Sequence, residues 1–197
     1  MGGNRKDFNR LETQRHIRNV FLDLYSRKGI DGVTVNELCR EAGIVKSTFY
    51  TYFEDKYSVL DEIETELLES LYQINDDLEH LELTPVYLGQ PLPQASRTVD
   101  FILEHLNEYR AIMGPKGDPS FESRWRRNIA ASFEDRFIKE KGDKKSAGLA
   151  CAIFSSTLIG IYRYIIFEEP DISKEDFTLI LGNTFKYALM DFHASIK

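Results

Sequence analysis

The sequence predicts an all-α protein in which a small N-terminal three-helix domain is joined by a long helix to a larger helical C-terminal domain. Almost every apolar segment has the three-to-four-residue spacing of a helix, and no alternating run is long enough to indicate a sheet. Capping residues, glycines and prolines separate these segments. We place the domain boundary after residue 56, which gives an N-terminal domain of residues 1–56 and a C-terminal domain of residues 57–197.

The N-terminal domain contains three predicted helices. The first covers residues 11–28, and Gly29 stands at its C-cap. The second, residues 34–42, opens with Thr34 three residues before Glu37, the spacing of a capping box in which each side chain accepts from the other's backbone amide. Gly43 follows it, and a short third helix covers residues 45–52.

The C-terminal domain begins with a long helix over residues 56–81, capped by Asp55 and apolar along one seam. Three prolines between residues 84 and 93 indicate a loop. Further helices are predicted at residues 94–110, 120–141, 144–168 and 173–196, with turn-rich stretches at 114–119 and 169–171 between them.

The charge is distributed unevenly along the chain. The composition, 42% hydrophobic and 29% charged, is that of a folded globular protein and excludes a disordered one. The net charge is −7, but residues 1–56 carry +2 and residues 57–197 carry −9. A mildly basic N-terminal domain joined to an acidic C-terminal domain fits a protein whose N-terminal domain binds the phosphates of nucleic acid while its C-terminal domain does not contact them.

Catalytic and metal-binding patterns are missing from the sequence. Cys39 and Cys151 lie far apart, and the four histidines are scattered, so we expect no disulfide, no metal site and no cofactor. The two cysteines are interpreted as small buried residues rather than redox switches. Because no nucleophile–base–acid set and no phosphate loop is visible, we expect a protein that is not an enzyme, and we expect it in the cytoplasm.

One segment raises the question of a membrane. Residues 147–167 are nearly uncharged and about long enough to span a bilayer. However, they include Arg163 and three consecutive hydroxyl residues at 155–157. We therefore interpret the segment as a buried helix at a subunit interface.

The two short helices with a glycine-containing turn between them predict a helix-turn-helix, in which the second helix presents its N-terminal residues to the DNA major groove. No acidic residue occurs from Ala42 to Phe53, which is informative in so acidic a protein. The second helix offers hydrogen-bond donors suited to phosphates and base edges. These candidate DNA-binding residues are Lys46, Ser47, Thr48, Tyr50, Thr51 and Tyr52.

The stretch from Thr34 to Lys56 resembles the signature of TetR-family transcriptional regulators, and the resemblance covers most of residues 10–65. It has a threonine-started helix, Ala-Gly followed by an aliphatic residue, a short helix containing Thr-Phe-Tyr, then an aromatic pair and a lysine opening the next helix. Residues 109–121 and 158–164 resemble the C-terminal domain of a subgroup common in Firmicutes.

The resemblance implies roles for matching residues. Lys46 and Ser47 would read base edges, with Val45 touching a thymine methyl group. Phosphate contacts would come from Thr34 or residues 35–36 and from Thr48, Tyr50, Tyr52 and Lys56. Phe49 and Phe53 would belong to the core. Two residues depart from the family pattern: Val45 replaces a capping residue, at a cost of about 1 kcal/mol, and Thr51 replaces a larger side chain.

Each of these residues also has a simpler interpretation. Tyr50 and Tyr52 either contact phosphates or pack in the small core. Lys46 either contacts DNA or is a solvated surface lysine. Lys56 either holds a phosphate or pairs with Glu54 or Asp61.

The C-terminal domain offers a candidate ligand pocket. Its predicted residues are Phe101, Tyr109, Trp125, Phe154, Tyr162 and Arg163. The aromatic residues either line a small-molecule cavity or form plain core. Arg163 either reaches a ligand carboxylate or pairs with Glu168, Glu169 or a neighbouring subunit.

The last two helices are the predicted dimer surface, because they carry more apolar residues than one protomer must bury. The predicted interface residues are Cys151, Phe154, Leu158, Ile165, Phe177, Leu181, Phe185, Ala188 and Phe192. In a two-fold dimer the recognition helices would lie about 34–36 Å apart, one turn of DNA, which predicts a palindromic operator.

Two functions follow from these observations. The first is a dimeric repressor that binds a palindromic operator and is released by a small-molecule effector acting through the helix at residues 56–81. The alternative is a co-activator or adaptor of the same fold whose C-terminal domain binds a protein partner.

Overall fold

The computed structural model describes residues 3–76 and 93–190 of the 197. Those residues form helices joined by short connections and contain no strand, so the predicted all-α class is confirmed. The chain divides into two compact units. The N-terminal unit consists of Met1–Leu67 together with Asn107–Pro119, and the C-terminal unit of Leu68–Leu106 together with Ser120–Lys197.

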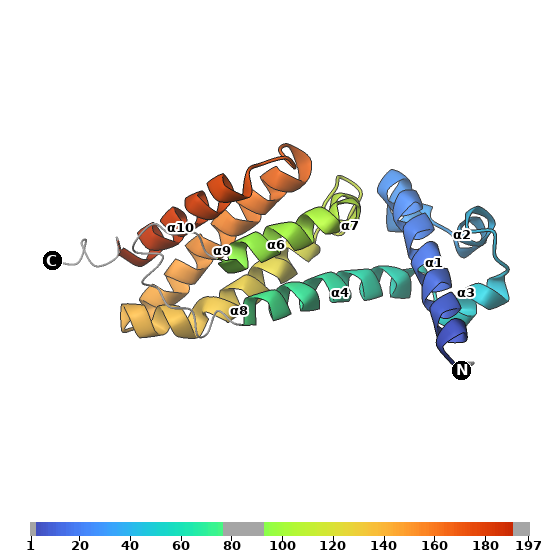
Figure 1. The fold of residues 1–197 in the computed structure, drawn as a ribbon, viewed down its shortest axis with the longest axis horizontal. Coiled ribbons are helices and arrows are strands. Elements are labelled where there is room, and N and C mark those ends of the chain that lie inside the picture. Colours follow the sequence, from blue (N-terminus) through green and yellow to red (C-terminus); the bar gives the residue numbers. More distant parts are fainter. Residues whose placement is uncertain (1–2, 77–92, 191–197) are drawn as a thin grey trace. The chain divides into compact units, whose positions relative to one another are not determined.

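The N-terminal unit contains α1 (Gly3–Gly32), α2 (Val35–Glu41), α3 (Lys46–Tyr52) and the first part of α4 (Lys56–Asp76), as Figure 1 shows. It also includes most of α7 (Leu106–Ile112) and the turn that follows. These compact units therefore divide the chain differently from the predicted boundary after residue 56. The reason is that α4 continues through that boundary as one helix, and a later segment packs with α1.

The core of the N-terminal unit is built from one face of each helix. Its fully buried side chains include Ile17, Phe21 and Leu24 of α1, Leu38 of α2, Phe49 of α3, and Val59 and Ile63 of α4. Outside this core, Arg18 of α1 bridges to Glu66 of α4 at 2.5 Å and to Glu62 at 3.6 Å. Gln14 donates to Glu62 at 2.6 Å. These contacts join α1 to α4.

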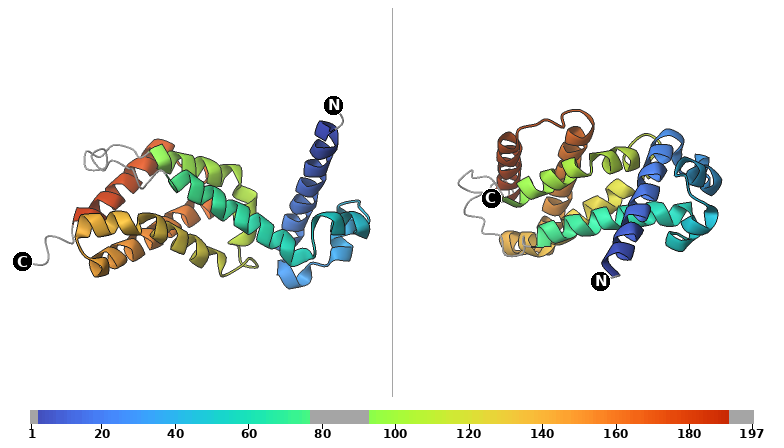
Figure 2. Two further views of the ribbon diagram at one scale, coloured as in Figure 1. Left: turned by 90° about the horizontal axis from the view of Figure 1, so that it is seen from below. Right: turned by 45° about the vertical axis from the view of Figure 1, so that its right-hand side comes forward.

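The C-terminal unit contains the end of α4 and four further helices: α6 (Pro93–Glu104), α8 (Phe121–Lys141), α9 (Lys144–Phe167) and α10 (Lys174–Met190). Helices α8 and α9 lie side by side along most of their lengths, as both views in Figure 2 show. Helix α10 packs on α9 and α6. Between α8 and α9, Phe154 contacts the rings of Phe133 and Phe137 at 4.7 and 5.8 Å.

Several helix boundaries differ from those expected. α1 reaches Gly32 because the chain continues past Gly29, which has φ of +70° and kinks the helix instead of ending it. The single helix expected at residues 94–110 is two helices, α6 and α7, separated at His105. The end of the helix expected at residues 56–81 and the last residues of that at 173–196 lie outside the described residues.

The predicted dimer-interface residues are largely used inside the protomer. The structure buries six of them, Cys151, Phe154, Leu158, Ile165, Phe177 and Leu181. They pack in the core of the C-terminal unit, which corrects their assignment to the dimer surface: one protomer buries these apolar side chains by itself. The side chains of Phe185 and Ala188, and the whole of Phe192, lie outside the described residues.

Helix α9 is long and apolar enough to cross a membrane by length and composition, and half of its most apolar window is buried inside the protein. Its buried side is the one that packs on α8 and α10. That arrangement is typical of a core helix in a helical domain, and the length alone is weak evidence for a membrane.

Candidate nucleic-acid interface

Helices α2 and α3 form a helix-turn-helix. Thr34 caps α2 by accepting a hydrogen bond from the Glu37 amide at 3.2 Å. After α2 the chain turns through Gly43, whose φ of +64° is strained for any residue with a side chain. The Ile44 amide closes the turn on the Cys39 carbonyl at 3.0 Å. These local interactions set where α3 begins.

The recognition helix α3 has one buried and one exposed face. Phe49 and, after the helix, Phe53 are buried, as the resemblance implies. The opposite face exposes the side chains of Val45, Lys46, Ser47, Tyr50 and Thr51. This face carries no carboxylate, so it can approach phosphates without repulsion.

The predicted DNA-binding residues differ in how far their side chains are exposed on that face. Thr48 and Tyr52 are half-buried at its edges, while Tyr50 is 56% exposed. Thr51 donates its hydroxyl to the Ser47 carbonyl at 2.8 Å, so on DNA it has only an acceptor to offer. Thr34 differs from Thr51 in this respect. Its hydroxyl oxygen accepts from the Glu37 amide, so the hydroxyl group can still donate to DNA.

Lys56 differs most from expectation. Its Nζ donates to the carbonyl oxygens of Ile30 at 2.7 Å and Val33 at 2.9 Å, and it lies 5.2 Å from the centre of the Tyr57 ring. Two of the three ammonium protons are therefore used within the domain. Lys56 fastens the end of α1 to the start of α4, where Asp55 and Ser58 cap each other's amides. The structure thus gives Lys56 a positioning role within the domain.

Val45 stands at the N-cap of α3 without a side-chain hydrogen bond and is 66% exposed. We expect Val45→Ser to stabilise the protein by about 1 kcal/mol, because serine accepts from the free amides of the first turn. Urea unfolding of the full chain measures this, with Val45→Ala as the matched control that removes the methyl groups without adding a cap. Equal stabilities of the two variants would contradict the expectation.

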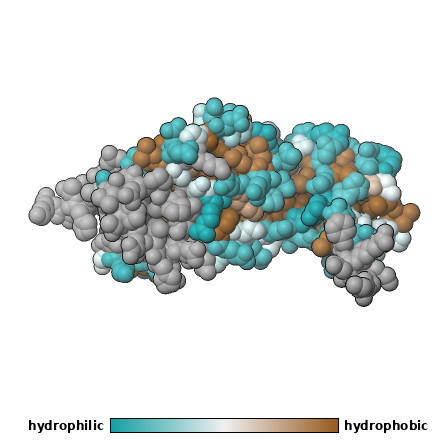
Figure 3. Space-filling model, viewed as in Figure 1, coloured by the Kyte–Doolittle hydropathy of each residue, from teal (hydrophilic) through white to brown (hydrophobic). Residues whose placement is uncertain are grey.

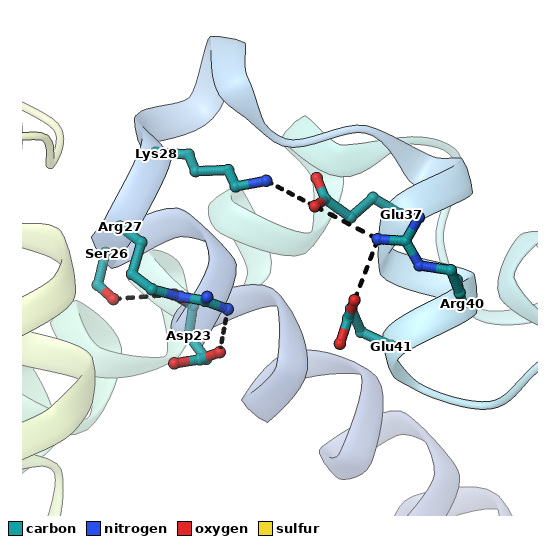
Figure 4. Close-up of polar contacts among 7 residues, drawn as sticks. All are labelled: Asp23, Ser26, Arg27, Lys28, Glu37, Arg40 and Glu41. Atoms are coloured by element: carbon teal, nitrogen blue, oxygen red, sulfur yellow. Dashed lines mark hydrogen bonds and ion pairs between the residues drawn. The ribbon is translucent and has the colours of Figure 1, made fainter.

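An ion-pair cluster covers the junction of α1 and α2, shown in Figure 4. Glu37 accepts from Lys28 of α1 at 2.5 Å and lies 3.6 Å from Arg40, which also pairs with Glu41 at 3.1 Å. Only half of the predicted capping box therefore forms, since the Glu37 carboxylate is engaged by Lys28. The hydrogen bond from Lys28, followed by the positive charges nearby, lowers the pKa of Glu37 from its ordinary value of 4.5.

This lowered pKa predicts a pH dependence. The lower pKa means that folding favours the ionised carboxylate, so its contribution is fully present above about pH 4.5 and is lost as pH falls through the folded-state pKa. Wild type should therefore lose its advantage over Glu37→Gln as the pH falls below 4.5. Urea midpoints of both proteins between pH 3 and 6 measure this, and a constant difference across that range would contradict it.

One positioning residue has no clear signal in the sequence. His16 of α1 places its Nε2 3.1 Å from the carbonyl oxygen of Ala42, at the C-cap of α2. The contact joins α1 to the start of the turn that precedes α3. A histidine on the polar side of an amphipathic helix is typical of a surface residue, so only the three-dimensional arrangement identifies it.

The predicted ligand-pocket residues are not gathered at one place. Trp125 stacks on Tyr162 with ring centres 5.2 Å apart, and Tyr162 lies 6.0 Å from Phe177. The Tyr162 hydroxyl hydrogen-bonds to Thr98, and burial raises its pKa. Phe154 instead belongs to the cluster with Phe133 and Phe137.

The other three predicted pocket residues lie apart from this stack. Phe101 is half-buried, with its ring 4.5 Å from that of His105. Tyr109 belongs to the N-terminal unit. Arg163 is exposed, pairs with Glu122 and lies 4.9 Å from the centre of the Phe167 ring, so one of its partners is a residue that was not predicted.

The fold and this site define an all-α helix-turn-helix protein. Residues 20–63 match the family model of bacterial regulatory proteins of the tetR family. This segment of the chain is that of a tetR-family regulator, as the resemblance implies. The Firmicutes-type subgroup stays a prediction.

Two curated relatives support the family. The HTH-type transcriptional regulator AcrR of Shigella flexneri is 32% identical over 93 residues, which are 47% of this chain and 41% of AcrR. The HTH-type transcriptional regulator YxbF of Bacillus subtilis (strain 168) is 22% identical over 101 residues, which are 51% of this chain and 26% of YxbF. The chain therefore spans less than half the length of each of these relatives.

A solved structure shows the same fold. The TetR transcriptional regulator from Streptococcus agalactiae 2603V superposes with a TM-score of 0.55 at 19% sequence identity, covering 95% of this chain and 97% of that one. The likeness therefore extends to the helical C-terminal half, which the family model does not reach.

Proposed function

We propose that this chain is a transcriptional repressor that binds a palindromic DNA operator as a homodimer and is released by a small-molecule effector. The observation that carries the proposal is the exposed, acid-free face of α3, with Lys46 and Ser47 at its N-terminal end. In a helix-turn-helix this end enters the major groove, where Lys reads guanine and serine is a versatile donor or acceptor. The small net positive charge of residues 1–56 supports the same orientation on DNA.

The residues of α3 and its neighbours are proposed to contact different parts of the DNA. Lys46, Ser47 and Val45 contact base edges, since they occupy the start of the helix. Thr48, Tyr50 and Tyr52 donate to phosphates from the following turns, and Thr34 donates from the start of α2. Thr51 can offer DNA only a hydrogen-bond acceptor. Lys56 holds the end of α1 against the start of α4.

The homodimer surface is proposed on the exposed side of α9 and α10. Figure 3 shows hydrophobic residues reaching the surface on these C-terminal helices. The large exposed apolar side chains there are Leu149, Ile153, Tyr164, Phe167, Leu179 and Ile180. Between them Gly160 has no neighbouring atom within 4 Å of the position that a Cβ would take, which leaves room for a close helix approach.

We expect Ile153→Glu to convert the dimer into a monomer, because it places a charge in the centre of this apolar face. Sedimentation velocity measures the change, and Lys145→Glu, on the exposed first turn of the same helix, is the matched control that stays dimeric. A wild-type chain that sediments as a monomer would contradict the homodimer. A stable complex with one other protein in its place would favour the adaptor function.

The effector is proposed to bind in the C-terminal unit and to act on the DNA-binding end through α4. This helix runs without interruption from Lys56, beside α3, past Leu67 and Leu68, where the N-terminal unit ends and the C-terminal unit begins. A rigid helix shared by both units transmits a displacement from one to the other.

The proposal is tested by selection of bound fragments from the source genome with the purified full chain at low salt. The expected result is a recurring palindrome with half-sites about one helical turn apart. Its neighbouring genes then identify candidate effectors, which should lower the affinity for this palindrome. Recovery of no common sequence would contradict the proposed function.

A further inference from the structure

The turn that follows α7 packs on the end of α1 although it comes from the middle of the chain. Residues Asn107–Pro119 are part of the N-terminal unit, separated in sequence by about forty residues from its other segment, which ends at Leu67. Lys116 Nζ donates to the Arg27 carbonyl oxygen at 2.5 Å. A Cβ added to Gly29 would lie 3.3 Å from the Lys116 carbonyl oxygen, so the turn meets α1 at its kink.

The turn itself has a tightly closed backbone. The Gly117 amide donates to the Gly114 carbonyl at 3.0 Å, and the Asp118 amide donates to the Ile112 carbonyl at 2.9 Å. A Cβ at Gly117 would lie 1.8 Å from the Ile112 carbonyl oxygen, and a Cβ at Gly114 would lie 2.5 Å from that of Arg110. Both positions therefore require glycine, and the closed turn holds Lys116 at a defined place.

The end of α1 needs such a donor. The non-helical Gly29 interrupts the regular hydrogen-bond ladder, and carbonyl groups in the turn before a break lack their usual amide partners. A lysine at this end also complements the negative end of the helix dipole. Lys116 donates a hydrogen bond to the carbonyl oxygen of Arg27 before the kink, and Lys56 donates to those of Ile30 and Val33 after it.

The same region brings α1, α4 and the turn together around Tyr25. This side chain is 1% exposed, and its burial, followed by the charges of Glu64 in α4 and Asp118 in the turn, raises its pKa. Tyr109 and Ile112 of α7 are fully buried. The turn is thus anchored by buried side chains, and Lys116 is its exposed tip.

We propose that the turn at residues 113–118 is a clamp on the C-terminal end of α1, and that Lys116 is a positioning residue for DNA binding by α3. The second part rests on the proposed function. Five residues after the kink, Thr34 caps α2, so the placement of residues 30–34 sets that of the helix-turn-helix. Because only His105 separates α7 from α6, a change in the C-terminal unit that displaces α7 withdraws Lys116 and loosens this end of α1.

The clamp is tested in the full chain with Lys116→Met, which keeps the long side chain but has no donor, and Lys116→Arg, which restores one. Lys139→Met, at an exposed position in α8, is the matched control. Hydrogen exchange of the amides at residues 28–34 is expected to be about threefold to fivefold faster in Lys116→Met, the effect of losing one partly exposed charge-assisted hydrogen bond. Lys116→Arg and Lys139→Met should exchange as wild type does. Unchanged exchange in Lys116→Met would overturn the clamp.

The affinity for the selected palindrome separates positioning from direct contact. Lys116→Met is expected to bind about threefold to fivefold more weakly, with an unchanged slope of log affinity against log salt concentration. A slope smaller by about one unit would mean that Lys116 contacts a phosphate, and would overturn the positioning role. An unchanged affinity would also overturn it. If wild type binds no DNA, the proposed function fails, while the exchange measurement still decides the clamp.

Discussion

Replacing Phe49 with alanine is expected to destabilise the protein by about 3–5 kcal/mol and to abolish DNA binding. Phe49 is the one fully buried side chain of α3 among those described, and its ring lies 5.4 Å from that of Tyr50 and 5.7 Å from that of Phe53. Removing a buried phenyl ring forfeits its transfer free energy and leaves a cavity. Since α3 has only seven residues, it has little stability without this contact.

Urea unfolding of the full chain, followed by circular dichroism, measures the loss of stability. Tyr50→Ala is the matched control, because this neighbouring aromatic residue is 56% exposed. Its stability should stay within about 0.5 kcal/mol of wild type, while its affinity for DNA falls. If Phe49→Ala were as stable as Tyr50→Ala, the assignment of α3's inner and outer faces would be wrong.

Replacing Lys46 with alanine is expected to weaken DNA binding by about 1–3 kcal/mol, a factor of roughly 5 to 150. Lys46 is exposed at the first residue of α3, where a long basic side chain reaches a base edge or a phosphate. The stability should be unchanged within about 0.5 kcal/mol, since the side chain is exposed to solvent.

The pattern of the loss identifies what Lys46 contacts. A base contact predicts a large loss on the selected palindrome and a small one on unrelated DNA, whereas a phosphate contact predicts a uniform loss and a smaller salt slope. Fluorescence anisotropy with both duplexes at several salt concentrations makes this comparison. Lys145→Ala, in the first turn of α9, is the control with the same charge change, and equal affinities of wild type and Lys46→Ala would contradict the proposed reading of DNA by α3.

The helix-turn-helix was predictable because its determinants are local. Thr34 and Gly43 mark the start and the end of α2 by capping and turn chemistry that act within a few residues. The core role of Phe49 follows from helical periodicity. By contrast, the partners of Lys56 lie 23 and 26 residues away, and no local pattern distinguishes them from Glu54 or Asp61.

The C-terminal half was less predictable because α9 is apolar on both sides. Periodicity shows that such a helix is buried but does not show which side faces the protomer's own core. Phe154 and Leu158 face inward, whereas Leu149 and Ile153 are exposed. No proline or glycine in the sequence marks the break between α6 and α7 at His105. One partner of Arg163, Glu122, comes from another helix, 41 residues away.

Site-directed cleavage tests whether α3 lies on the DNA. Ser47→Cys, at an exposed position of α3, carries an iron chelate that cleaves nearby DNA, while Cys39 and Cys151 are buried. Lys139→Cys in α8 carries the same label as the control. Strand cleavage centred on the two half-sites, about one helical turn apart, is expected for the Ser47 label alone. Intact DNA under a bound Ser47-labelled dimer, or the same cleavage from Lys139, would contradict it.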